Sequence, residues 1–512
     1  MRIWLWGAAT ALALASGTTA RAEWQEASSA NFVVYSDDAP EKVKAFATEL
    51  ERFDKGMRVM RGVPDQVISP AQRVMVFVLR NAATVEKLIG SRDVAGFYIP
   101  RVSGSVAFVP RRNGGGAEDD LSAMAVLLHE YAHHFMYANF GGKAYPAWFV
   151  EGFAEFNATA RMRDGKLFFG APPLYRAYGM TDTQQLPARD LLTKSPQQAK
   201  MTREQTQTFY GRSWLLVHYL TFGAGQTGVL SKYLAALNSG RSVTEAAAVL
   251  GDLRKLDSAL NSYAMQSRLS ATTIDAAKLT IGPVVVRALS PAEAAMMPVR
   301  IRSARGVSGT EATAVAALAR KAAAPWPNDP AAQVALAEAE FDVGDYAAAD
   351  AAAARALVAD PGRTNALMYR GKAQAEIAAK ASVRDPKVWQ GVRKWFARAN
   401  AGDPENPWPL TEYYISYFRW GQRPSPSATK GLAYAHALAP FDRGLSMTAA
   451  AMYITDDKPL EAAQALRSVA YDPHGGALST QAAAILTALT DGGTKAAQTA
   501  LGNIAKPTLE SD

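Results

Sequence analysis

The chain has 512 residues, of which 49% are hydrophobic and 20% are charged, and it contains no cysteine. This composition predicts a globular protein of several domains and excludes a disordered chain, a collagen-like chain and a polytopic membrane protein. The lack of cysteine also excludes disulfides, thiolate zinc sites, iron–sulfur clusters and a cysteine nucleophile. The formal net charge is +8 without any run of five basic residues, so we expect no nucleic-acid partner.

Residues 1–22 have the pattern of a secretory signal peptide. Arg2 supplies a positive charge, residues 3–15 form an apolar stretch, and Ala20 and Ala22 occupy the small-residue positions before a cleavage site. No later segment reaches about 18 uninterrupted apolar residues, the length that a membrane span requires. We therefore expect an exported protein, periplasmic or secreted, with no stable membrane insertion after the signal is cleaved.

The mature chain begins with alternating strand-like and helix-like segments. Residues 31–35 and 73–79 are rich in β-branched and aromatic side chains, which predicts strands. Residues 39–60 carry apolar side chains at helical spacing. A third predicted strand, 104–110, ends in proline, and this favours an edge strand or a strand end over a central strand.

The middle of the chain is mainly helical, from about residue 121 to residue 269. Residues 271–327 then form a mixed connector, in which 281–286 predict a short strand. Within the same connector, Ser290 followed by Pro-Ala-Glu has the pattern of a helix start.

From residue 328 the chain is alanine-rich and repetitive. Asp-Pro or Ala-Pro pairs recur, with their prolines 31, 43, 36 and 33 residues apart. This spacing is close to the roughly 34-residue period of tetratricopeptide helix pairs. The first unit, from Leu336 to Pro361, resembles that family in detail, and the second contains an insertion around residues 379–385. A generic alanine-rich helical bundle is the alternative.

The segment that indicates chemistry is His129-Glu130-Tyr131-Ala132-His133. On a helix, His129 and His133 lie four residues apart on one face, so both imidazoles can reach one ion, with Glu130 beside it. Zinc at a catalytic site needs a third protein ligand and an open position for water. For this segment alone, an ordinary amphipathic helix is the alternative.

A pair of carboxylates follows in the segment that begins at Pro146, Pro-Ala-Trp-Phe-Val-Glu-Gly-Phe-Ala-Glu. Pro146 fits the first turn of a helix, which places Glu151 and Glu155 one turn apart on one face. HExxH followed by Trp-x-x-Glu-Gly-x-Ala resembles the gluzincin metallopeptidases, the group that contains thermolysin and aminopeptidase N. The resemblance implies that Glu151 completes a site for one Zn²⁺ per chain with His129 and His133. It also implies that Glu155 orients the first zinc histidine, for which a solvated helix-face glutamate is the alternative.

The segment around Tyr210 resembles the aminopeptidase segment whose tyrosine opens a helix and stabilises the oxyanion. The resemblance implies this role for Tyr210, although Gly-Arg-Ser follows it here where the aminopeptidases usually carry Glu-Lys-Gly. A tyrosine packed at a helix start is the alternative. Among the other histidines, we expect His218 in the core and His134 turned away from the ligands, while His436 and His474 lie in the repeats and carry no signal.

The predicted edge strand precedes the HExxH helix, which is the order in which gluzincins hold an extended substrate against a strand. It lacks the glutamate with which aminopeptidases bind the substrate amine, so we favour an endopeptidase. Glu130 would then act as the general base, as the resemblance implies.

The sequence as a whole predicts an α+β zincin-like metallopeptidase domain followed by an all-α tetratricopeptide-like helical repeat domain. The expected parts are a signal peptide (1–22), the metallopeptidase domain (23–270), the connector (271–327), the repeats (328–500) and a tail (501–512). The expected function is hydrolysis of a peptide or protein substrate, with the repeats binding that substrate or a protein partner. An inactive scaffold that acts through its repeats is the alternative, as is a zinc hydrolase of cell-wall peptide cross-links.

Overall fold

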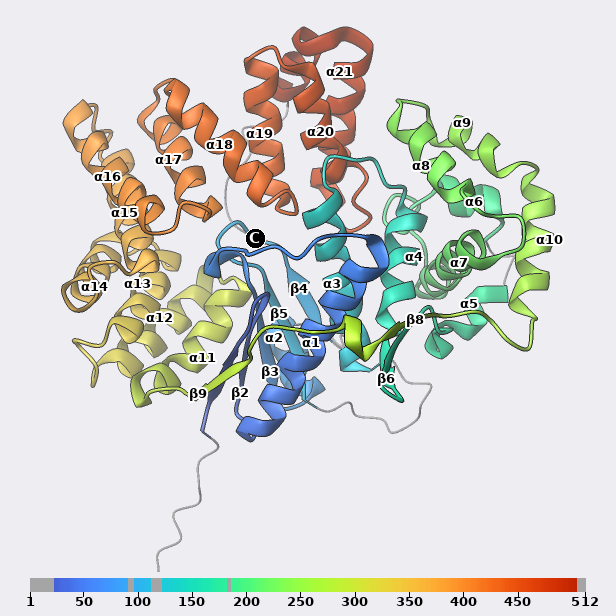
Figure 1. Cartoon of the computed structure of the whole chain (residues 1–512). Coiled ribbons are helices and arrows are strands. Elements are labelled where there is room, and N and C mark those ends of the chain that lie inside the picture. The colour runs from blue at the N-terminus through green and yellow to red at the C-terminus, as the bar shows by residue number, and fades with distance from the viewer. Residues whose placement is uncertain (1–22, 91–95, 112–121, 182–185, 504–512) are drawn as a thin grey trace, which may run out of the picture.

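The computed structural model describes residues 23–90, 96–111, 122–181 and 186–503 (Figure 1). The predicted signal peptide and residues 504–512 of the predicted tail lie outside the described residues. Strands occur in the first part of the described chain, and helices follow one another from residue 291 onward.

The first part is built on a six-stranded sheet with the strand order β4-β5-β3-β2-β1-β9. Strands β2, β3 and β5 run parallel, whereas β4 and β1 are antiparallel to their neighbours and β9 is antiparallel to β1. The strands are β1 (Gln25–Ser28), β2 (Phe32–Ser36), β3 (Val74–Leu79), β4 (Phe97–Ile99), β5 (Val106–Pro110) and β9 (Val285–Ala288).

The two faces of the sheet are covered by different helices. One face carries Val34 and Val76, and it packs on α1 (Pro40–Arg61) and α3 (Ala123–Phe140) in the main core. The opposite face packs on α2 (Ala82–Ile89) and α11 (Pro291–Arg305) through an aromatic row across the strands. In this row the rings of Tyr35, Phe77 and Phe108 stack at centroid distances of 5.4 and 5.3 Å. The alternation of side chains along each strand thus gives the sheet two buried faces.

The sequence predicts residues 104–110 as an edge strand or a strand end: the edge position is wrong, whereas Pro110 does end the strand. Strand β5 lies between β3 and β4, all five of its residues are buried, and the edge strands of this sheet are β4 and β9. Pro110 is tolerated because it ends the strand: the backbone N–H of Arg111, not of Pro110, donates to the carbonyl of Leu79. A short, wholly apolar run such as β5 is typical of a strand buried on both faces.

A second, three-stranded sheet takes two strands from the region expected to be mainly helical and one from the expected connector. It joins β6 (Arg161–Arg163), β7 (Lys166–Phe169) and β8 (Thr272–Asp275) in that order. Two of its strands form a hairpin, and the third arrives from about a hundred residues later in the chain. The remaining helices of this part are α4 (Ala147–Ala158), α5 (Ala177–Thr181), α6 (Ala188–Thr193), α7 (Arg203–Phe222), α8 (Val229–Asn238), α9 (Val243–Ala247) and α10 (Leu253–Ala264).

Residues 271–327, expected as a connector, divide between the two parts. Strand β9 begins at Val285, later than the predicted 281–286, and pairs with β1 in the first sheet. Helix α11 begins after Ser290, whose hydroxyl accepts from the backbone N–H of Glu293 in a capping box, as its sequence predicted. Helices α11 and α12 (Gly309–Ala323) already pack on α13, so the helical stack begins before residue 328.

The second part is a stack of helices with repeat-like packing. Each helix contacts the next along the chain, and α13, α15 and α17 also contact one another in that order. This nearest-neighbour pattern is the arrangement of helical repeat proteins. The helices are α13 (Pro330–Asp342), α14 (Tyr346–Ala359), α15 (Thr364–Lys380), α16 (Pro386–Gly402), α17 (Pro407–Trp420), α18 (Pro426–Leu438), α19 (Arg443–Thr455), α20 (Pro459–Ala470) and α21 (Gly476–Asn503), the last kinked at Gly493.

The helical stack curves around the sheet, so that its last helices, α19–α21, lie beyond the end of α3 (Figure 1). Direct contacts hold the two parts together. The backbone N–H of Val102 donates to Asp442 over 2.6 Å, and the Gln72 side chain donates to the carbonyl of Leu438 over 2.9 Å. The ring of Phe441 packs at 4.6 Å from the ring of His134 on α3. The repeats are therefore docked against the helix that carries the HExxH motif.

Candidate metal centre

Helices α3 and α4 pack against each other and carry the three predicted metal ligands. Helix α3 is capped by Ser122, whose hydroxyl accepts from the backbone N–H of Ala125 over 2.9 Å. His129 and His133 project from one face of α3, with their Nε2 atoms 3.1 Å apart. Glu151 lies on α4 and is completely buried. Its Oε2 atom lies 3.4 Å from Nε2 of His129 and 3.7 Å from Nε2 of His133.

These three distances fit the edges of a tetrahedron around one zinc ion. Ligand atoms at about 2.0–2.1 Å from zinc, separated by tetrahedral angles, lie about 3.4 Å from one another. Among the described residues, this is the one cluster of histidine and acidic side chains with metal-binding spacing. Neither carboxylate oxygen of Glu151 accepts a hydrogen bond of good geometry within the described parts of the chain, although Oε1 pairs with Nε2 of His474 at 2.9 Å. A buried carboxylate oxygen without a donor is costly, and a cation bound between the three side chains would compensate that cost.

The charges around the cluster favour the ionised carboxylate. Burial raises the pKa of Glu151, but the nearby His474, His129 and His133 outweigh burial and hold this pKa well below its ordinary value. Burial lowers the pKa of His129, but the carboxylates around it, Glu151 first, raise it above its ordinary value. The ionised form of the Glu151 carboxylate is the form that can coordinate a divalent cation.

Glu155 lies one turn beyond Glu151, on the far side of the His129 ring. Its Oε1 atom is 3.5 Å from Nδ1 of His129, the nitrogen that faces away from the other two ligands. The same carboxylate accepts from Arg176 over 2.8 and 3.0 Å and from the hydroxyl of Tyr175 over 3.0 Å. Glu155 is therefore held beside His129 by Arg176 and Tyr175, rather than solvated on a helix face.

Tyr210 also faces the cluster, although it does not open a helix as expected. It lies inside α7, where its ring is 6.1 Å from the ring of His129 and the guanidinium of Arg176 lies 4.8 Å from its centroid. Burial, together with the nearby Glu151, raises the pKa of Tyr210 well above 10. Glu130 is half-buried, and its charge contributes to raising the pKa of His129.

The sequence assigns no role to His474, but the structure places this residue beside the cluster. This residue follows α20 in the repeat part of the chain, yet its Nε2 atom lies 2.9 Å from Oε1 of Glu151. Its ring centroid is 5.5 Å from that of His133. Partial desolvation lowers the pKa of His474, whose side chain remains 34% exposed, but the carboxylates of Glu151, Glu130 and Asp472 raise this pKa to about 9. The repeat spacing predicts a turn here, but gives no sign that this turn meets the HExxH helix.

The other histidines are engaged elsewhere. His218 is fully buried, with Nδ1 2.9 Å from the hydroxyl of Tyr263 and Nε2 2.9 Å from the carbonyl of Ser270, so it is a core residue as expected. His134 is turned away from the ligands, and its Nδ1 atom bonds with the hydroxyl of Tyr98 at 2.6 Å. His436 lies on α18, where burial lowers its pKa to about 4.

A cavity of about 220 Å³ lies away from the cluster, between the six-stranded sheet and the helices α11, α13 and α15. Its lining includes Arg101, Arg300 and Glu338, and none of the predicted metal or catalytic residues. In the described chain, no helix combines the length and the apolar character that a membrane crossing requires.

No family model and no curated protein matches the chain. Among solved structures, the chain is similar to a thermophilic tetratricopeptide-repeat protein from Thermus thermophilus, with 19% identity and a TM-score of 0.30. That match covers 34% of this chain and 90% of the other chain. The helical repeat part is defined by the packing of α13–α21 in this chain.

Proposed function

We propose that the chain is an exported, zinc-dependent metallopeptidase of the gluzincin type, an endopeptidase whose helical repeats bind the substrate or a protein partner. The observation that carries the proposal is the arrangement of His129, His133 and Glu151, whose ligand atoms lie 3.1–3.7 Å apart. The order of the motifs along the chain, HExxH and then the Glu-Gly-x-Ala-Glu segment, supports the same class.

Three side-chain atoms would hold the ion: Nε2 of His129, Nε2 of His133 and Oε2 of Glu151. Two histidines and a glutamate form a catalytic type of zinc site, which leaves one position for water or substrate. When bound, zinc acidifies water and polarises a carbonyl as a Lewis acid. Glu155 beside Nδ1 of His129 fixes the orientation and tautomer of that ring, as acidic groups behind zinc histidines commonly do.

Glu130 and Tyr210 supply the remaining chemistry. Glu130 accepts the proton of the attacking water and delivers it to the leaving amine, the role of a general base and then acid. Tyr210 donates its hydroxyl proton in a hydrogen bond to the oxygen on which negative charge develops. A tyrosine hydroxyl is protonated at neutral pH, and a donor of this kind is worth roughly 3 kcal/mol in comparable oxyanion sites.

The first test is the zinc content of the chain from Glu23 onward, measured by elemental analysis beside the variant Glu151→Ala. We expect about one zinc per chain, lost in Glu151→Ala although the circular dichroism spectrum is retained. Failure of the purified wild-type chain to bind added zinc would overturn the proposal and favour a scaffold that acts through its repeats.

The second test separates catalysis from metal binding. Glu130→Gln should keep the zinc and lose cleavage of a library of internally quenched peptides, because Gln cannot accept the water proton. Cleavage of the peptide library, but not of aminoacyl p-nitroanilides, would support an endopeptidase. Full activity of Glu130→Gln would contradict the mechanism.

A further inference from the structure

The connection between α20 and α21 brings a repeat-domain histidine to the proposed zinc site. This connection contains Asp472, Pro473 and His474. The two oxygens of the Glu151 carboxylate point to different partners: Oε2 faces His129 and His133, and Oε1 lies 2.9 Å from Nε2 of His474. His474 is therefore placed behind the ligand oxygen and not among the ligands themselves.

The connection is held rigidly enough to position a side chain. One oxygen of Asp472 accepts from the backbone N–H of His474 over 2.8 Å, and the other pairs with the guanidinium of Arg443 on α19. The hydroxyl of Ser479, at the start of α21, donates to the carbonyls of Val469 and Asp472 over 2.6 and 3.1 Å. Backbone and side-chain bonds thus fix this connection from both flanking helices.

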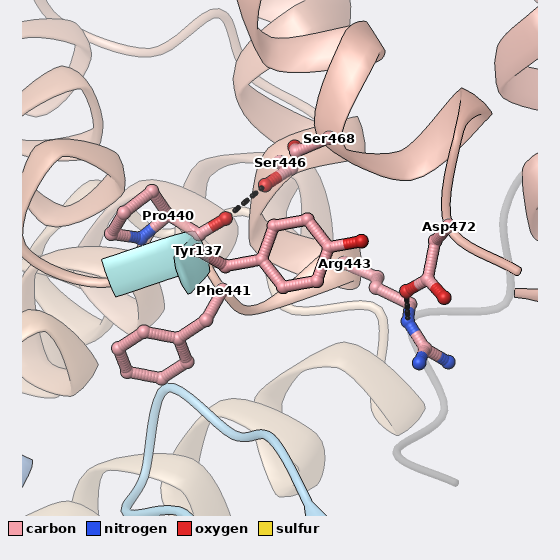
Figure 2. A pocket seen from close by; sticks show the side chains of 7 residues that line it. All are labelled: Tyr137, Pro440, Phe441, Arg443, Ser446, Ser468 and Asp472. Carbon is pink, nitrogen blue, oxygen red and sulfur yellow. Dashed lines mark hydrogen bonds and ion pairs between the residues drawn. The ribbon is translucent and has the colours of Figure 1, made fainter. Parts of the chain in front are cut away.

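The HExxH helix itself contacts the same region. Figure 2 shows Tyr137, one turn beyond His133 on α3, in a small pocket that Arg443 and Asp472 also line. The side chains of Pro440 and Phe441 close the pocket from the repeat side (Figure 2). The repeats and the HExxH helix therefore share one packed interface, and His474 extends from its edge to Glu151.

We propose that His474 is a positioning residue of the metal centre: its imidazole pairs with Oε1 of Glu151, the Nε2–Oε1 distance being 2.9 Å, so that Oε2 is presented to the ion as a single ligand atom. The repeat domain is then a structural part of the metal site and not only a separate binding module. A partner that holds a ligating carboxylate in this way typically affects metal affinity 10–100-fold. This inference rests on the metal site of the proposed function.

The experiment measures the zinc dissociation constant of the full chain from Glu23 onward, by competition with a chromophoric chelator. We expect His474→Ala to raise the dissociation constant about 10–100-fold. His474→Gln, whose amide can donate to the same oxygen, should restore most of the affinity. Cobalt(II)-substituted protein supplies a spectroscopic readout, because a reoriented Glu151 changes the visible absorption bands of the ion.

The matched control is His436→Ala, which removes a half-buried histidine from α18 and so weakens the repeat domain away from the site. We expect it to leave the zinc affinity and the cobalt spectrum unchanged. Equal losses of affinity in His436→Ala and His474→Ala would overturn the inference, because repeat stability alone would then explain the effect.

Two further results separate this inference from the proposed function. A wild-type chain that binds one zinc, with an unchanged affinity in His474→Ala, overturns the positioning role and leaves the proposed function intact. The same unchanged affinity with a higher rate of peptide cleavage would identify His474 as an inhibitory contact instead. A wild-type chain that binds no zinc overturns both proposals.

Discussion

Gly152 allows helices α4 and α7 to cross closely beside the proposed zinc ligand Glu151. A Cβ atom added at Gly152 would lie 2.3 Å from the carbonyl oxygen of Ser213 and 2.7 Å from both its carbonyl carbon and Cγ2 of Val217. The first two of these atoms belong to the backbone of α7, which cannot rotate away as a side-chain tip can. Ordinary contacts of this kind are about 3.5 Å long, so Gly152→Ala must separate the two helices by on the order of 1 Å.

This displacement has two expected consequences. Overpacking of a well-packed interior costs about 1–3 kcal/mol, of which the better helix propensity of alanine returns at most about 1 kcal/mol. Zinc sites tolerate ligand shifts of only about 0.2 Å, so moving α4 by on the order of 1 Å carries Glu151 out of its position. We expect Gly152→Ala to lower the urea midpoint and to weaken zinc binding about tenfold or more.

The assay combines urea unfolding, followed by circular dichroism, with chelator competition for zinc. Gly391 on α16 is the matched control, because a Cβ atom added there has no heavy atom within 4 Å. Gly391→Ala should stabilise the chain by up to about 1 kcal/mol and leave zinc binding unchanged. If Gly152→Ala unfolded at the same urea midpoint as the wild type and bound zinc with the same affinity, the claim that this glycine sets the position of Glu151 would be refuted.

Three further predictions concern stability. Burial lowers the pKa of His218 to about 4. Between this value and the ordinary histidine pKa of about 6.5, the unfolded chain binds a proton that the native chain does not, so the free energy of unfolding falls as the pH drops below about 6.5. By linkage this loss is about 2 kcal/mol near pH 5. The urea midpoint of His218→Gln should therefore fall less than that of the wild type between about pH 7.5 and about pH 5. Arg176→Leu leaves the Glu155 carboxylate buried without the guanidinium that pairs with it, so the free energy of unfolding in urea should fall by about 3–5 kcal/mol. Arg176→Lys keeps a positive charge and should lower this free energy less. Asp442→Ala and Asp385→Ala each remove a helix N-cap worth about 1 kcal/mol. Only Asp442 also accepts a hydrogen bond from the backbone N–H of Val102, across the interface between the sheet part and the repeats. Asp442→Ala should therefore be the more sensitive of the two variants to limited proteolysis.

Local features of the fold could be predicted from the sequence. The apolar spacing of residues 39–60 predicts a helix that the structure places at Pro40–Arg61, and the pattern Ser290 to Glu293 predicts the helix start at which α11 begins. His129 and His133 share a face because four residues span about one helical turn, whatever the surroundings. These predictions succeed because each depends on residues within one or two turns of one another.

The order of strands in a sheet depends on pairing between segments that are far apart in the chain, and the sequence did not predict this order. Pro110 favoured an edge position for β5, but the three-residue strand β4 covers that edge, and so short a strand leaves little pattern to recognise. The hairpin β6–β7 acquires its third strand, β8, from residues 272–275, which no local signal connects to it. Pairing between segments this far apart is decided by packing of the whole domain, not by propensity.

The position of His474 follows from the same non-local packing, and it has a thermodynamic consequence. If His474 strengthens zinc binding 10–100-fold, linkage requires that bound zinc strengthen the docking of the repeats by the same factor, about 1.4–2.7 kcal/mol. A ligand of the repeats that pulled the α20–α21 connection away from Glu151 would then lower the zinc affinity by up to this amount. Zinc should accordingly protect the α20–α21 connection from proteolysis in the wild-type chain, and protect it less in His474→Ala.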